Sequence, residues 1–143
     1  MVIADTGFWL ALANRKDGYH AVALERVRGL REPLITTWPV VTETCYLLLS
    51  RLGTANQRAF MESFAAGAFE VFDLRREYAA RLSALMEQYA DLPMDLADAS
   101  LVLLAEELND GRILSTDDRD FRTYRWKRRK PFENLLLGPS LRA

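Results

Sequence analysis

Short apolar segments alternate with helical patterns along most of this chain. The apolar segments cover residues 2–4, 34–36, 69–72 and 113–115, and each has the length of a strand. Short strands that alternate with helices of ten or more residues are typical of parallel sheets with helices on both faces. The sequence therefore predicts an α/β fold with a short, mainly parallel sheet of four to five strands, flanked by helices on both faces.

The helices between these strands are predicted from apolar spacing and from the residues that favour helix ends. A helical face begins at Phe8, and Gly53 and Gly67 are expected to end two later helices. Asp95 is a good N-cap residue. Further helices are expected at residues 22–30, 40–52, 54–66, 75–89 and 96–108. The length of 143 residues suits one globular domain, so we expect a single domain over residues 1–143.

Several kinds of site are excluded by composition. The chain has one histidine, His20, and one cysteine, Cys45, which cannot build a zinc cage or a disulfide framework. One cysteine and no signal-like apolar N-terminus favour a cytoplasmic location. We expect no membrane span, because no segment approaches about 20 consecutive apolar residues.

Acidic residues recur at the ends of the predicted segments. Asp5 closes the first apolar run, Asp118 follows the last one, and Glu43 and Asp98 lie early in helical patterns. Ligands of open α/β sheets bind beyond the carboxyl ends of the strands, so these four acids could converge there. Converging carboxylates repel one another, and a divalent cation relieves that repulsion. Oxygen ligands favour Mg²⁺ or Mn²⁺, and metal-activated water is the chemistry of phosphodiester hydrolysis.

Four short motifs resemble, in order and spacing, those of PIN-domain ribonucleases. They are Val2-Ile3-Ala4-Asp5-Thr6, Val41-Thr42-Glu43, Asp98-Ala99 and the segment 114–121. A chain of this length further resembles the VapC-type toxins of toxin–antitoxin pairs. The resemblance implies an endoribonuclease that depends on Mg²⁺ or Mn²⁺ and cuts structured or translation-related RNA. It also implies a cognate antitoxin protein and a homodimer.

The same resemblance implies roles for individual residues. Asp5, Glu43 and Asp98 look like metal-coordinating acids. Asp118 matches the fourth acid, in a Thr-x-Asp-x-x-Phe pattern that runs from Thr116 to Phe121. Thr6 and Thr116 look like hydroxyl partners of the acids or of a substrate phosphate.

The residues also leave alternatives open. Asp95 could replace Asp98 as a ligand, Asp117 could replace Asp118, and Asp95 with Asp98 also has the spacing of a structural helix cap. A PIN-like module that binds RNA or protein without cutting is the main alternative function. The Asp5-Thr6-Gly7 triplet occurs in aspartic proteases, but those are all-β proteins. Haloacid-dehalogenase-type phosphatases require a second aspartate where this chain has glycine.

A basic segment follows the last acidic motif. Between Arg119 and Lys130, seven of twelve residues are Arg or Lys, although the net charge of the chain is −1. The segment is interleaved with Phe121, Tyr124 and Trp126, so it could hold an RNA backbone and stack bases. It could equally be a solvated face, or a set of charges that prevents an edge strand from pairing with another chain.

Overall fold

A five-stranded parallel sheet forms the centre of the protein in the computed structural model, which describes residues 1–138. The strand order is β3-β2-β1-β4-β7, and every neighbouring pair in this sheet is parallel. The strands are β1 (Val2–Ala4), β2 (Leu34–Thr37), β3 (Phe69–Phe72), β4 (Arg112–Leu114) and β7 (Glu133–Asn134). This arrangement confirms the predicted fold class.

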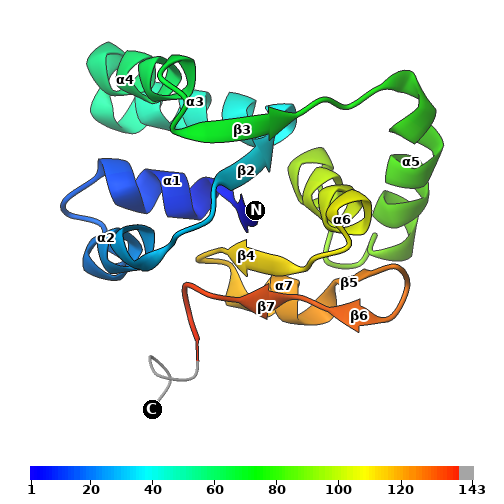
Figure 1. Cartoon of the computed structure of the whole chain (residues 1–143). Coiled ribbons are helices and arrows are strands. Elements are labelled where there is room, and N and C mark those ends of the chain that lie inside the picture. The colour runs from blue at the N-terminus through cyan, green and yellow to red at the C-terminus, as the bar shows by residue number, and fades with distance from the viewer. Residues whose placement is uncertain (139–143) are drawn as a thin grey trace.

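Helices cover both faces of this sheet. In Figure 1, α1 and α2 lie on one side of the strands, and α5 and α6 lie on the other. The helices are α1 (Thr6–Ala13), α2 (His20–Gly29), α3 (Trp38–Leu52), α4 (Thr54–Ala65), α5 (Ala79–Gln88), α6 (Leu96–Leu108) and α7 (Asp118–Thr123). A short 3₁₀ helix, η1 (Arg76–Tyr78), precedes α5, where the sequence predicted one continuous helix from residue 75. None of the helices within residues 1–138 is long and apolar enough to cross a membrane.

The core lies on both sides of β1, the middle strand. All three residues of β1 are fully buried, because β2 and β4 flank it and helices cover it. On the α6 side, that helix is buried over most of its length, which explains its run of Ala and Leu. On the other side, Trp9 of α1 packs with Phe60 and Phe69, and Phe64 also packs on Phe69.

The C-terminal segment contains elements that the sequence did not predict. The stretch that begins at Asp118 forms α7, and Asp117 caps this helix by accepting a hydrogen bond from the Asp120 N–H. An antiparallel hairpin follows, made of β5 (Arg125–Trp126) and β6 (Lys130–Pro131). The chain then adds β7 beside β4, which extends the sheet at the edge nearest to α7.

Candidate metal centre

Asp5 lies at the carboxyl end of the central strand and caps α1. Its side chain is 7% exposed, and it accepts hydrogen bonds from the Thr6 backbone N–H at 2.7 Å and from the Ser115 hydroxyl at 2.9 Å. Burial raises the pKa of Asp5 to about 6, although these two hydrogen bonds oppose the shift. The negative charges of Glu43 and Asp117 raise the pKa of Asp5 further. Asp5 is therefore both the N-cap of α1 and a member of the acidic site.

Ser115, which follows β4, joins two of the acidic segments. Its hydroxyl donates to Asp5 and accepts the backbone N–H of Asp117 at 2.9 Å. The amide of Asn134 in β7 holds Ser115 in place, because it accepts from the Ser115 N–H and donates to the Ser115 carbonyl. The last strand of the sheet therefore fixes the turn that carries Asp117.

The two threonines predicted as hydroxyl partners form no side-chain hydrogen bond to the acids among the described residues, and their role toward a substrate phosphate stays a prediction. Thr6 uses its backbone N–H, and its hydroxyl oxygen is buried without a hydrogen-bond partner among the described residues. Thr116 packs closely against Gly7, where an added Cβ would overlap the Thr116 hydroxyl. The glycine of the Asp-Thr-Gly triplet thus allows the turn after β4 to approach α1. The triplet lies at a strand-to-helix junction of a parallel sheet, which is not the setting of an aspartic protease.

Asp98 lies in the first turn of α6 and faces Asp5. Its backbone N–H donates to the cap residue Asp95 at 2.9 Å, so the cap uses the main chain of Asp98 and not its carboxylate. That carboxylate accepts a hydrogen bond from the hydroxyl of Tyr124 at 2.8 Å. Burial is the largest cause that raises the pKa of Asp98 to about 7, and the charge of Asp5 adds to it.

Tyr124, for which the sequence left base stacking open as one possibility, is a fully buried partner of Asp98. Burial and the hydrogen bond to Asp98 raise the pKa of the Tyr124 phenol well above its ordinary value. The phenol therefore keeps its proton and acts as a permanent donor to the carboxylate. Nothing in the sequence separates this tyrosine from an exposed one, because it lies within a basic segment.

Three carboxylates gather where α6 and α7 begin. One oxygen from each of Asp98, Asp117 and Asp120 can be chosen so that all lie within 4.8 Å of one another. Burial, and then the hydrogen bond with Asp117, raise the pKa of Asp120. Asp117 and Asp120 share a face because they are three residues apart at the start of a helix.

The carboxylate of Asp118 lies in a different environment. It pairs with Arg122, one helical turn later, at 2.6 Å. It also lines a cavity of about 290 Å³ together with Phe121, Phe132 and Asn134. Helix α7 begins at this residue, and consecutive helical side chains point in different directions. Metal binding by Asp118 stays a prediction, and the geometry favours Asp117 in its place.

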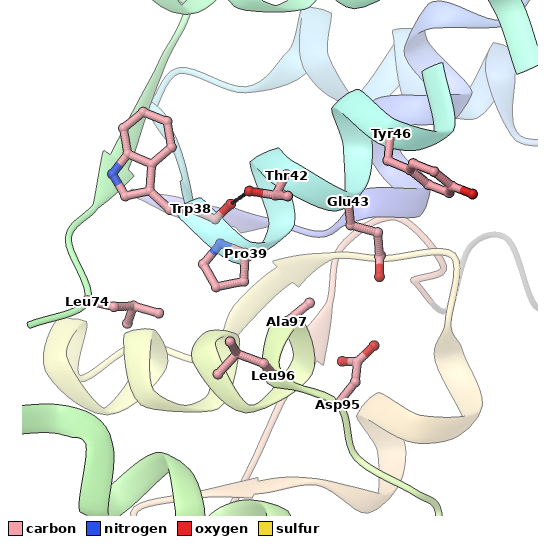
Figure 2. A pocket seen from close by; sticks show the side chains of 9 residues that line it. All are labelled: Trp38, Pro39, Thr42, Glu43, Tyr46, Leu74, Asp95, Leu96 and Ala97. Atoms are coloured by element: carbon pink, nitrogen blue, oxygen red, sulfur yellow. Dashed lines mark hydrogen bonds between the residues drawn. The ribbon is translucent and has the colours of Figure 1, made fainter. Parts of the chain in front are cut away.

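Glu43 lies on α3 at the edge of the acidic group. It lines a cavity of about 740 Å³ between α3 and the start of α6, with Trp38, Tyr46, Asp95 and Leu96 among the other lining residues. Figure 2 shows the carboxylates of Glu43 and Asp95 pointing toward one another across this cavity. Glu43 is not part of the tight group of three carboxylates, but its charge acts on Asp5.

The chemistry of this group fits a hard divalent cation. Within residues 1–138, no lysine or arginine forms an ion pair with Asp5, Asp98 or Asp117. Their mutual repulsion and burial are therefore not relieved by a basic side chain, which is why two of the pKa values are raised. Carboxylate oxygens are the preferred ligands of Mg²⁺ and Mn²⁺. Asp5, Glu43, Asp98 and Asp117 are the residues that could hold such an ion, with Asp120 beside them.

Comparison with known proteins points to one family. Ribonuclease VapC26 of Mycobacterium tuberculosis is 28% identical over 124 residues, which cover 87% of this chain and 92% of that protein. The crystal structure of Mycobacterium tuberculosis VapC20, a sarcin-ricin loop cleaving toxin, has the same fold with a TM-score of 0.77 at 19% identity. The match covers 83% of this chain and 92% of VapC20. The family model described as PIN domain matches residues 2–127, and the chain therefore belongs to the PIN-domain family.

Proposed function

We propose that this protein is an endoribonuclease that requires a divalent metal ion and acts as the toxin of a toxin–antitoxin pair. The observation that carries the proposal is a group of buried and partly buried carboxylates that lie just beyond β1 and β4 and in the first turn of α6. The pKa values of Asp5 and Asp98 are raised, and no basic side chain in the described part of the chain forms an ion pair with Asp5, Asp98 or Asp117. The likeness to a protein named as a ribonuclease supports the choice of RNA as substrate.

Four residues hold the metal ion in this proposal, namely Asp5, Glu43, Asp98 and Asp117. When bound there, Mg²⁺ or Mn²⁺ supplies a Lewis acid that activates water and offsets the charge of a phosphodiester. Ser115 orients Asp5 through its hydroxyl, and Tyr124 orients Asp98. Asp117 takes the place that the sequence motif gave to Asp118.

The partners expected of a VapC-type toxin are part of the same proposal. A separate antitoxin protein restrains the enzyme, the active form is a homodimer, and the protein works in the cytoplasm. The resemblance of this chain to VapC-type toxins supports the first two points, and its single cysteine supports the third.

The test is a cleavage assay on a mixed pool of structured RNAs. Purified protein is incubated with Mg²⁺, with Mn²⁺ or with EDTA, and the variants Asp5→Asn, Asp117→Asn and Asp118→Asn are run in parallel. We expect cleavage only with metal, its loss in Asp5→Asn and Asp117→Asn, and its retention in Asp118→Asn. The Asp118 variant is a matched control, because it removes the adjacent charge outside the group of carboxylates.

Each other outcome has a defined meaning. Cleavage by Asp5→Asn at the wild-type rate would refute the metal site. Loss of cleavage in Asp118→Asn with full activity of Asp117→Asn would restore the assignment made from the motif. RNA binding without cleavage, unchanged in all variants, would favour the non-catalytic module.

A further inference from the structure

We propose that the tip of the β5–β6 hairpin is a second RNA contact, which holds the backbone of a helical stem while the metal centre acts on another part of the same molecule. The inference deepens the proposed function and rests on it for the cleavage step. The tip, residues Lys127–Lys130, is called the basic turn below.

The basic turn is a concentrated positive charge at the protein surface. Lys127, Arg128, Arg129 and Lys130 are consecutive and all exposed. No acidic side chain within the described residues forms an ion pair with Arg128 or Arg129. Such unneutralised guanidinium groups suit phosphate oxygens, which they bind as bidentate donors.

The backbone of the turn is strained where the charges lie. Lys127 has a φ of 46° and Arg128 a φ of 71°, so both are in the left-handed region. Residues 127–129 connect the two strands, and hairpin-loop positions with positive φ are usually Asn or Gly, which tolerate that conformation. Lys and Arg have no intrinsic preference for positive φ, and strain of this kind concentrates at functional sites. The Lys127 ammonium donates to Asn109, whereas a role in binding accounts for the exposed Arg128 at a position of positive φ.

The turn is held rigidly by its surroundings. The backbone N–H of Lys127 donates to the Glu106 carboxylate at 2.6 Å, and its ammonium donates to Asn109 at 2.7 Å. Trp126 is 7% exposed and packs against Gly111, where an added Cβ would overlap its ring. The Lys130 ammonium lies 4.9 Å from the centre of the Trp126 ring. The exposed guanidinium groups therefore project from a fixed platform.

The aromatic residues of this segment are not available to stack bases, which was one of the possibilities that the sequence left open. Phe121, Tyr124 and Trp126 are all buried. Proteins that bind single strands combine positive charge with exposed aromatic rings, on which bases stack. A basic surface without such rings fits the backbone of a stem, whose bases are already stacked on one another.

The distance between the two sites also fits a folded RNA. Lys127 contacts Asn109 just past the end of α6, and Asp98 lies in the first turn of that helix. Eleven residues at a rise of about 1.5 Å each place the two sites about 16 Å apart. In Figure 1, the chain leaves the end of β4, passes through α7 and reaches the hairpin below α6. Exposed Arg119, next to Asp120 in α7, carries positive charge along this path.

Exposed aromatic rings lie at the other end of this path. Trp38 and Tyr46 are 38% and 67% exposed, and they line the cavity that Glu43 and Asp95 also line. Unpaired nucleotides would thus lie at the metal centre and paired ones at the basic turn.

The test measures binding by fluorescence anisotropy, with EDTA present, so that it does not depend on cleavage. The probes are a labelled RNA hairpin with a 12-base-pair stem and a labelled 12-nucleotide poly(U) strand. The variant is Arg128→Gln/Arg129→Gln. The control is Arg28→Gln/Arg31→Gln, which removes the same charge from exposed positions at the end of α2 and beyond it.

We expect the basic-turn variant to bind the hairpin about tenfold more weakly at low salt, with a log–log salt dependence shallower by about 2. Poly(U) binding and the control variant should change much less. Arg128→Lys/Arg129→Lys, which keeps both charges but loses the bidentate guanidinium donors, should bind more tightly than the glutamine variant and more weakly than the wild type. Far-ultraviolet circular dichroism and the melting temperature establish that each variant is folded.

Three results would overturn the inference. They are an unchanged salt dependence for the hairpin, an equal loss in the control variant, or an equal loss of affinity for poly(U). The last would mean a contact with single strands. Because no metal is present, failure here leaves the proposed nuclease activity intact. Conversely, a protein that binds the stem through the basic turn and cuts no RNA would refute the nuclease proposal alone.

Discussion

Replacing Asp5 with Asn removes a buried negative charge while it keeps the shape of the side chain. Burial raises the pKa of Asp5 from its ordinary value of 3.8 to about 6 in the folded protein. In the unfolded chain, the carboxyl group ionises near its ordinary value. Between these two pH values the folded state holds more protons than the unfolded state, so stability falls as the pH rises.

The magnitude follows from the two pKa values. A difference of about 2 units at 1.36 kcal/mol per unit corresponds to about 3 kcal/mol, which the metal-free protein loses between about pH 4 and pH 7. Asn keeps an acceptor for the Thr6 N–H and carries no charge, so the stability of the variant should not fall in this way as the pH rises. We therefore expect Asp5→Asn to be more stable than the wild type at pH 8 and similar to it at pH 4. At about 3 °C per kcal/mol, the difference in melting temperature at pH 8 is about 9 °C.

The assay is thermal unfolding by circular dichroism at pH 4, 6 and 8 in EDTA, repeated with Mg²⁺ at pH 8. Mg²⁺ should raise the melting temperature of the wild type and not that of the variant, because a ligand stabilises only the folded state that binds it. Asp91→Asn is the control, since this aspartate is exposed. Parallel pH curves for wild type and Asp5→Asn, or a variant less stable at pH 8, would refute the reasoning.

Two further substitutions test the surroundings of the acids. Tyr124→Phe removes the hydrogen bond that lowers the pKa of Asp98. The acid limb of the pH–rate profile should therefore move to higher pH, and activity at pH 6 should fall more than activity at pH 8. An unchanged profile would show that the phenol does not act on Asp98. Gly7→Ala places a Cβ against the Thr116 hydroxyl and should destabilise the protein by about 1–3 kcal/mol in urea denaturation. Gly18→Ala, at a position with open space, serves as its control, and equal stability of both variants would contradict the close packing.

The main architecture was predictable because it depends on long, periodic patterns. The strand at residues 69–72 and the helix at 96–108 have the predicted bounds, and both are bordered by glycine or by cap residues. The segment after residue 117 was not predictable in this way. Strand β7 has two polar residues, and it forms because β4 offers an edge and the Asn134 amide binds Ser115. Such tertiary pairing leaves no periodic signal.

The same distinction applies to the acids. The positions of Asp5 at the end of a strand and of Asp98 at the start of a helix could be predicted from the sequence. The choice between Asp117 and Asp118 depends on which residue begins α7. Three of the four residues from Asp117 to Asp120 are aspartates, and any of them could cap a helix, so the sequence does not identify the first helical residue. The hydroxyl partners were missed for different reasons: Ser115 lies in an apolar strand pattern that resembles a core position, whereas Tyr124 lies in a basic segment that resembles an exposed one.

The hydrogen bond between Ser115 and Asp5 joins residues 110 positions apart. At a synthesis rate of about 5–20 residues per second, β4 and the turn after it are made on the order of 10 s after β1. A chain released before residue 115 has Asp5 but lacks both Ser115 and Asp117. If the metal site is as proposed, premature termination yields fragments that cannot cut RNA, and an active nuclease forms only after nearly the whole protein has been made.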